Sequence, residues 1–148
     1  MSRDLYQQRM LELAAAADEP QPLDEPDASA TLDNPLCGDR VRIDLRCHAD
    51  GRVAAIAPAV RGCVLCRAAA ALVARHGPGR DQDELRTLRG QLQAGLRGEG
   101  ALPTAGDWPE LEIFQPVAAH KSRHECVLLP FDALVAALEQ ARPTSGTG

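Results

Sequence analysis

Three of the five cysteines in the sequence stand at predicted junctions between secondary-structure elements. Cys37 lies in the turn-like stretch NPLCGDR, Cys63 opens an alanine-rich helical stretch, and Cys126 precedes the last helical stretch. Junctions at one end of a sheet can converge in space, whereas packing cysteines more often lie within an element. The positions favour a shared thiol site, and burial as a small apolar residue is the alternative for each cysteine.

Asp39 adds a carboxylate to this set, because it lies two residues after Cys37 across a glycine. In a turn, Cys-Gly-Asp can direct both side chains at one point. Three thiolates and one carboxylate form a four-coordinate tetrahedral set that suits zinc or an iron–sulfur unit. We therefore predict a metal site formed by Cys37, Asp39, Cys63 and Cys126. At Cys63 the N-terminus of a helix also favours the thiolate.

Several basic residues lie close to these predicted ligands in the sequence. Arg40, Arg61 and Arg123 are each within three residues of one of them and can offset the negative charge of the set. His124 is an alternative ligand in place of Asp39. A solvated surface position is the competing interpretation for each of these four side chains.

Cys63 and Cys66 also form a C-x-x-C pair at a helix start, which is the arrangement of thiol–disulfide modules. Such modules place the pair after a strand in a βαβ unit, whereas a hairpin precedes it here and no aromatic residue is near. We therefore place Cys66 outside the metal set. Cys47 is predicted to pack on the inward face of a strand.

The pattern of the chain predicts one α+β domain over residues 1–148, with a small antiparallel sheet and helices packed on one face. The order begins with a helix at 3–17 and an extended connector at 18–30. Period-two strands at 41–47 and 52–60 follow, joined by an Asp50-Gly51 hairpin turn. The remaining predicted elements are a helix at 63–76, a helix from Asp81, a loop at 98–110, a short helix or turn at 111–117, a last helix over 127–141 that starts near Pro130, and a flexible tail at 143–148.

Composition and charge narrow the class of protein. A net charge of -5 argues against a general nucleic-acid binder, which carries a basic face. No apolar run reaches the roughly 18 residues that a membrane span needs. The stretch MSRDLYQQRM has charges where a signal peptide would be apolar. We therefore expect a cytoplasmic protein without membrane or nucleic-acid partners, in which an odd number of cysteines argues against a disulfide framework.

The ordered motifs resemble a known family. NPLCGDR, a hairpin with Asp-Gly at its turn, G-C-x-x-C-x-A, R-x-x-C and LPFDAL resemble the U-type iron–sulfur cluster assembly scaffolds, which include IscU, SufU and the N-terminal part of NifU. The resemblance implies a SufE/IscU-like sandwich fold. Arg123 before Cys126, Glu125 where IscU-like members have histidine, and an insertion at 98–119 favour the SufU-like branch.

The same resemblance implies a function. Members accept persulfide sulfur from a PLP-dependent cysteine desulfurase and serve a downstream iron–sulfur carrier or apo-protein. It implies that Cys37, Cys63 and Cys126, with Asp39, hold zinc, or alternatively iron or a [2Fe–2S] cluster, and that Cys37 and Cys126 are the sulfur acceptors. The chain is then a scaffold or a zinc-dependent sulfurtransferase. A purely structural zinc-binding interaction domain and, more remotely, a C-x-x-C thiol–disulfide module are the alternatives that stay open.

Overall fold

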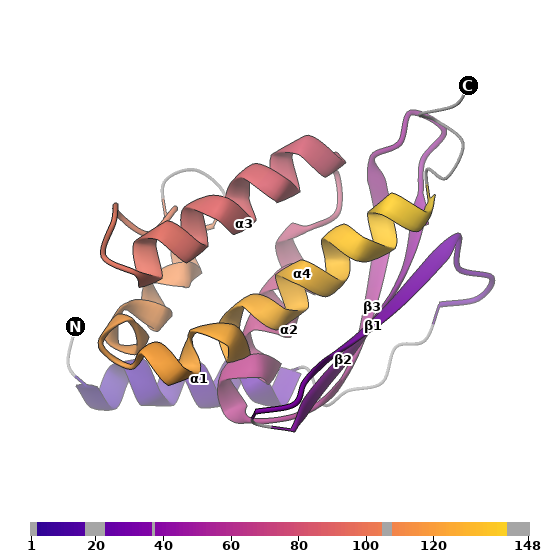
Figure 1. The fold of residues 1–148 in the computed structure, drawn as a ribbon. Coiled ribbons are helices and arrows are strands. Elements are labelled where there is room, and N and C mark those ends of the chain that lie inside the picture. Colours follow the sequence, from indigo (N-terminus) through magenta and orange to yellow (C-terminus); the bar gives the residue numbers. More distant parts are fainter. Residues whose placement is uncertain (1–2, 17–22, 37, 105–107, 142–148) are drawn as a thin grey trace.

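The computed structural model describes residues 3–16, 23–36, 38–104 and 108–141 (Figure 1). The tail predicted at 143–148 and residues 18–22 of the predicted connector lie outside these ranges. In chain order the elements are α1 (Arg3–Ala16), β1 (Ala28–Asn34), β2 (Asp39–Cys47), β3 (Val53–Arg61), α2 (Val64–His76), α3 (Gln82–Leu96), the 3₁₀ helices η1 (Pro109–Ala119) and η2 (Lys121–Arg123), and α4 (His124–Ala141).

The sheet is antiparallel with the strand order β1-β2-β3. The predicted hairpin between β2 and β3 is confirmed: the His48 N–H donates to the Arg52 carbonyl at 2.8 Å, and Gly51 has a φ of +91° that suits glycine. Pro58, which has no N–H to donate, lies on β3 at the edge of the sheet.

The strand β1 corrects the sequence prediction. Residues 28–30 had been assigned to the extended connector, but they start a strand that pairs with β2 from Ala28 opposite Leu45 to Asn34 opposite Asp39. The buried positions at the start of this strand are alanines, so its alternation carries little hydrophobic contrast. Pairing with residues 39–45 of β2 defines the strand instead.

Helices gather on one side of the sheet, as predicted for an α+β fold (Figure 1). The inward face of β2 contributes Val41, Ile43 and Leu45, all completely buried. The alanine run of α2 packs into the same core, because small side chains allow a helix to approach its neighbours closely. None of the helices in the described ranges has both the length and the apolar character needed to cross a membrane.

The last helix begins earlier than predicted. α4 starts at His124, directly after η2, so Pro130 lies inside the helix and not at its start. Cys126, predicted at a break before the helix, is the third residue of α4. Proline in a helix interior costs about 3 kcal/mol, and here burial of the flanking Leu129 and Phe131 offsets that cost. The predicted start of α3 is confirmed, since Asp81 caps it with a capping box to Glu84.

Candidate metal centre

Three of the four predicted ligands converge in the structure. One ligand atom from each of Asp39, Cys63 and Cys126 lies within 4.8 Å of the other two. They come from the first residue of β2, the N-cap of α2 and the first turn of α4. Cys37, the fourth predicted ligand, lies outside the described residues.

The Asp39 carboxylate is buried and is anchored to Cys63. Asp39 is only 2% exposed, although an isolated buried carboxylate is unfavourable. Its Oδ1 accepts a hydrogen bond from the backbone N–H of Cys63 at 3.0 Å, and its Oδ2 lies 3.6 Å from the Cys63 Sγ. These contacts join the start of β2 to the start of α2.

Gly62 makes room for this carboxylate. A Cβ at position 62 would lie 2.6 Å from Asp39 Oδ1 and 2.9 Å from its Cγ, closer than real Cβ atoms approach. This requirement was not predicted from the sequence. The signal available in the sequence was a glycine directly before a candidate ligand cysteine.

Both described cysteines of the group stand at helix N-termini. Cys63 is the N-cap of α2, with no side-chain hydrogen bond to the helix, and Cys126 lies in the first turn of α4. The unpaired N–H groups at the start of α2 favour negative charge near Cys63, whereas α4 continues directly from η2 and its first N–H, from His124, donates to the Lys121 carbonyl. Cys63 is half-buried and Cys126 is 3% exposed. The two thiols therefore differ in access from solvent.

Other residues near the predicted ligands have different roles. Arg40 pairs with Asp33 across the sheet at 2.6 Å, and Arg61 is exposed. His124 is buried, and its Nε2 lies 3.2 Å from the Ala118 carbonyl oxygen, a contact outside the Asp39–Cys63–Cys126 group. Among the described residues, Asp39 lies in the group of candidate ligands and His124 lies outside it.

The two remaining cysteines lie outside the group. Cys66 is completely buried in the core that α2 helps to form. Cys47 is half-buried at the end of β2 and packs against the same core, on the face predicted from the strand alternation.

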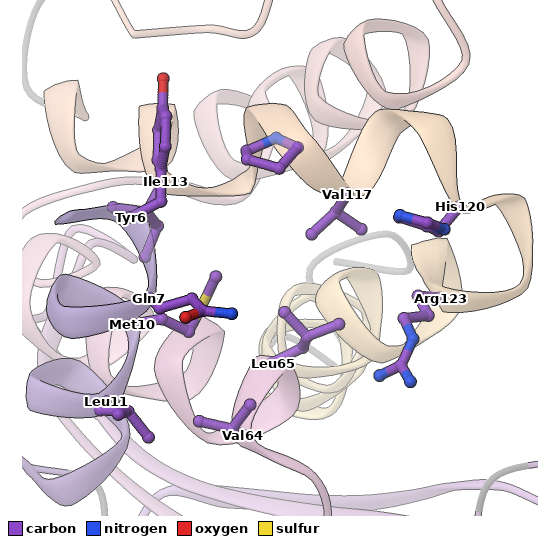
Figure 2. A pocket seen from close by; sticks show the side chains of 11 residues that line it. Tyr6, Gln7, Met10, Leu11, Val64, Leu65, Ile113, Val117, His120 and Arg123 are labelled. Carbon is purple, nitrogen blue, oxygen red and sulfur yellow. The ribbon is translucent and has the colours of Figure 1, made fainter. Parts of the chain in front are cut away.

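An apolar pocket of about 520 Å³ opens beside the group. Figure 2 shows α1 side chains along one side of it and Val117, His120 and Arg123 on the other. Its lining residues are Tyr6, Gln7, Met10, Leu11, Val64, Leu65, Ile113, Pro116, Val117, His120 and Arg123. Val64 and Leu65 directly follow Cys63, so the pocket and the metal group share the first turn of α2. This pocket was not predicted from the sequence, in which the apolar residues after Cys63 are the available indication of it.

The donor chemistry of the group fits a tetrahedral metal ion. Zn–S bonds of about 2.3 Å place tetrahedral ligand atoms roughly 3.7 Å apart, and the three ligand atoms here all lie within 4.8 Å of one another. Two sulfurs and one carboxylate oxygen supply three of four positions, the soft set that zinc and iron–sulfur units prefer.

Comparisons with known proteins place these features in context. The crystal structure of the N-terminal part of a nitrogen-fixing NifU-like protein from Brucella abortus aligns over 95% of this chain and 96% of its own, with 36% identity and a TM-score of 0.85. A SufU structure from the thermophile Fervidobacterium islandicum AW-1, named as a candidate iron–sulfur cluster assembly scaffold for the SUF system, covers 93% of this chain and 99% of its own, with 17% identity and a TM-score of 0.80. No protein-family model and no curated protein matches the chain.

Proposed function

Because this chain belongs to the family of U-type iron–sulfur cluster assembly scaffolds, we propose that it accepts sulfur from a PLP-dependent cysteine desulfurase at a Cys₃Asp site. The observation that carries this proposal is the convergence of Asp39, Cys63 and Cys126 from three separate elements. Cys37, two residues from Asp39 in the sequence, is the proposed fourth ligand. The SufU-like branch remains a prediction, since 17% identity to a SufU structure supports the fold alone.

Zinc is the proposed resting metal. When bound to such a set, zinc keeps the thiols deprotonated at neutral pH and shields them from oxidants. The chain contributes a fixed carboxylate, because Asp39 is held by the Cys63 N–H, and two thiols at helix N-termini. A [2Fe–2S] cluster assembled on the same residues is cargo, which passes to a downstream iron–sulfur carrier or apo-protein.

Sulfur acceptance needs one thiolate of the set. That thiolate attacks the outer sulfur of the desulfurase persulfide, a new S–S bond forms on the scaffold cysteine, and the desulfurase cysteine leaves as a thiolate. Cys37 and Cys126 are the proposed acceptors. Because Cys126 is only 3% exposed, its direct reaction with a desulfurase persulfide requires movement of the residues that cover it.

The test combines the metal content with sulfur transfer. The purified chain is expected to contain about one zinc per molecule, and mixing with a cysteine desulfurase and L-cysteine should add about 32 Da per accepted sulfur. Cys37→Ala and Cys126→Ala locate the acceptor, and Cys47→Ala is the matched control. Zinc without any persulfide, and without a change in desulfurase rate, would leave the structural zinc domain as the function.

A further inference from the structure

Cys66 is a core thiol that the proposed metal set does not use. It is the third residue of α2, three positions after Cys63 at the N-cap. The first turn that carries both cysteines is closed, because the Arg67 N–H donates to the Cys63 carbonyl at 3.1 Å. Cys66 is therefore held in the first turn of a formed helix, and Cys63 caps that turn.

This spacing brings the two thiols within reach of each other. Residues three apart on a helix are neighbours, with Cβ atoms about 5–6 Å apart. A disulfide requires Cα atoms roughly 4.4–6.8 Å apart and Cβ atoms that can approach to about 4 Å. Cys63 has extended dihedrals, φ −73° and ψ 171°, so this end of the pair lies on backbone outside the helix. Bridging the pair therefore needs adjustment at the helix start.

The two thiols differ in exposure in the way that a persulfide-bearing thiol and a resolving thiol require. Cys63 takes its sulfur from a persulfide on Cys37 or Cys126: its thiolate attacks the outer sulfur, and the delivering cysteine leaves as a thiolate. Cys63 is half-buried at the helix end, beside the Asp39 carboxylate. Cys66 is 0% exposed, so a partner protein cannot reach it without opening the core. A reaction of Cys66 with a group already attached to Cys63 is intramolecular and needs no access from outside.

The chemistry of cluster assembly creates a need for such a pair. Desulfurase-derived sulfur in a persulfide is at the oxidation level of elemental sulfur, whereas the bridging sulfur of a [2Fe–2S] cluster is sulfide. Each sulfur atom must therefore gain two electrons between delivery and assembly. Two thiols that become a disulfide supply two electrons.

We infer that Cys66 is a resolving thiol that cleaves a persulfide on Cys63 and releases the sulfur as hydrosulfide. The Cys66 sulfur attacks the inner sulfur of Cys63–S–S⁻, a Cys63–Cys66 disulfide forms, and the outer S–S bond breaks. The outer sulfur leaves with the electron pair of that bond and takes the Cys66 proton, so it departs as HS⁻. A dithiol reductant then returns both cysteines to thiols.

This inference rests on the proposed function for the use of the sulfide, but its test does not need a desulfurase. Reduced, metal-free protein is treated with inorganic polysulfide, excess reagent is removed, and sulfide release is followed without added reductant. Trypsin cleaves after Arg61 and Arg67, so residues 62–67 form one peptide that contains both cysteines. In wild type this peptide should lose about 2 Da as sulfide appears, and dithiothreitol should restore its mass.

The Cys66→Ala variant should retain about 32 Da of added sulfur on Cys63 and release sulfide at least tenfold more slowly. Cys47→Ala, which removes another half-buried thiol, should behave like wild type. Wild-type release rates in Cys66→Ala, or a disulfide that joins Cys63 to Cys37 or Cys126, would overturn the inference. The wild-type peptide mass is decisive even where a variant folds poorly. If polysulfide gives the disulfide and sulfide but the desulfurase transfers no sulfur, the inferred chemistry stands and the proposed function fails.

Discussion

At the scale of single residues, the Asp39 carboxylate connects the candidate ligands to the backbone around them. It accepts the Cys63 N–H at 3.0 Å and lies in space that only a glycine at position 62 leaves open. A residue that orients a metal ligand typically changes metal affinity 10–100-fold when it is altered. Substitutions at Gly62 and at Asp39 therefore test the position of the carboxylate and its role as a ligand separately.

Gly62→Ala is expected to weaken zinc binding by roughly 10–100-fold. The added Cβ would meet Asp39 Oδ1 at 2.6 Å, so the carboxylate must move away from the Cys63 N–H. A competition titration with a zinc chelator measures the change. Gly90→Ala is the matched control, because a Cβ there meets nothing within 4 Å. Affinity within about twofold of wild type in Gly62→Ala would show that Asp39 does not need this position.

The Asp39→Ala variant tests whether the Asp39 carboxylate is a ligand of the [2Fe–2S] cluster that the chain passes on. Asp39 is the one oxygen donor in the proposed set, and oxygen is a poorer partner than thiolate for an iron–sulfur unit. Its removal should slow the loss of a reconstituted [2Fe–2S] cluster to an apo-acceptor, followed by visible absorbance. Asp39→Asn retains an oxygen for the Cys63 N–H and separates the charge from the hydrogen bond. Cluster loss at the wild-type rate in the alanine variant contradicts this role.

Some properties of these site residues could be predicted from the sequence and others could not. The positions of the cysteines and of the aspartate in the sequence were sufficient to predict that Asp39, Cys63 and Cys126 converge. The space at Gly62 and the burial of Cys66 depend on how β2 meets α2, which is a tertiary property. Neither can be read from the composition or period of one segment.

At the scale of elements, the strongly patterned segments were predicted and the weakly patterned ones were not. β2 alternates buried and exposed residues, and α3 has a capping residue at Asp81, so both were recognised. β1 has alanines at its first buried positions, and α4 contains Pro130. In those two cases tertiary pairing and burial outweighed the local signal.

The two internal glycines of α3 should respond oppositely to alanine. Gly90 has open space around it, so Gly90→Ala should stabilise the protein by about 0.5–1 kcal/mol through the lower entropy of the unfolded chain. Gly95 lies against Leu102, whose backbone N and Cα would be 3.0 Å from a new Cβ. Gly95→Ala should therefore destabilise by about 1–3 kcal/mol. Urea unfolding measures both, and a shared sign would contradict the packing of Leu102 on α3.

Glu110 joins the end of α2 to the start of η1. It contacts both Arg75 and His76, and the His76 ring lies 5.3 Å from the Trp108 ring in an edge-on arrangement. Burial raises the pKa of Glu110, but the hydrogen bond with His76 and the charge of Arg75 outweigh it, so that this pKa lies below its usual value of 4.5. The carboxylate form is thus favoured in the folded state.

The pH dependence follows from the direction of that shift. A carboxyl group with a lowered folded pKa stabilises the protein above its unfolded pKa and loses this contribution as the pH falls through the folded pKa. Glu110→Gln should cost about 0.5–1 kcal/mol at pH 7, since the site is partly screened by solvent. The difference from wild type should shrink below about pH 4.5. Urea unfolding at several pH values checks this, and a difference that grows toward low pH would contradict the assignment.

At the scale of the whole molecule, the candidate site exists only when three distant segments are folded together. Asp39 begins β2, Cys63 precedes α2 and Cys126 lies in the first turn of α4. Their convergence was predictable, because each was expected near a junction at one end of the sheet. The exact start of α4 was not, since a proline at position 130 was expected to begin the helix.

A ligand that binds this site should therefore stabilise the whole fold. An ion that binds only the folded state adds about 2.7 kcal/mol at a free concentration of 100 times its Kd. For a domain of this size about 1 kcal/mol raises the Tm by roughly 2–4 °C, so zinc should raise the Tm by roughly 5–10 °C. Thermal unfolding of the metal-free chain with and without buffered zinc measures the shift.

Variants connect this stabilisation to the site. Cys63→Ser and Cys126→Ser should lose most of the zinc-dependent rise, because each removes a sulfur from the Asp39–Cys63–Cys126 group. Cys47→Ala should keep it, since Cys47 lies at the far end of β2 from Asp39. A full rise in Cys126→Ser would show that α4 contributes no zinc ligand. No rise in wild type would show that the proposed zinc site does not exist. A rise that depends on residues from β2, α2 and α4 together requires the folded arrangement, because no two of these elements supply all three ligands.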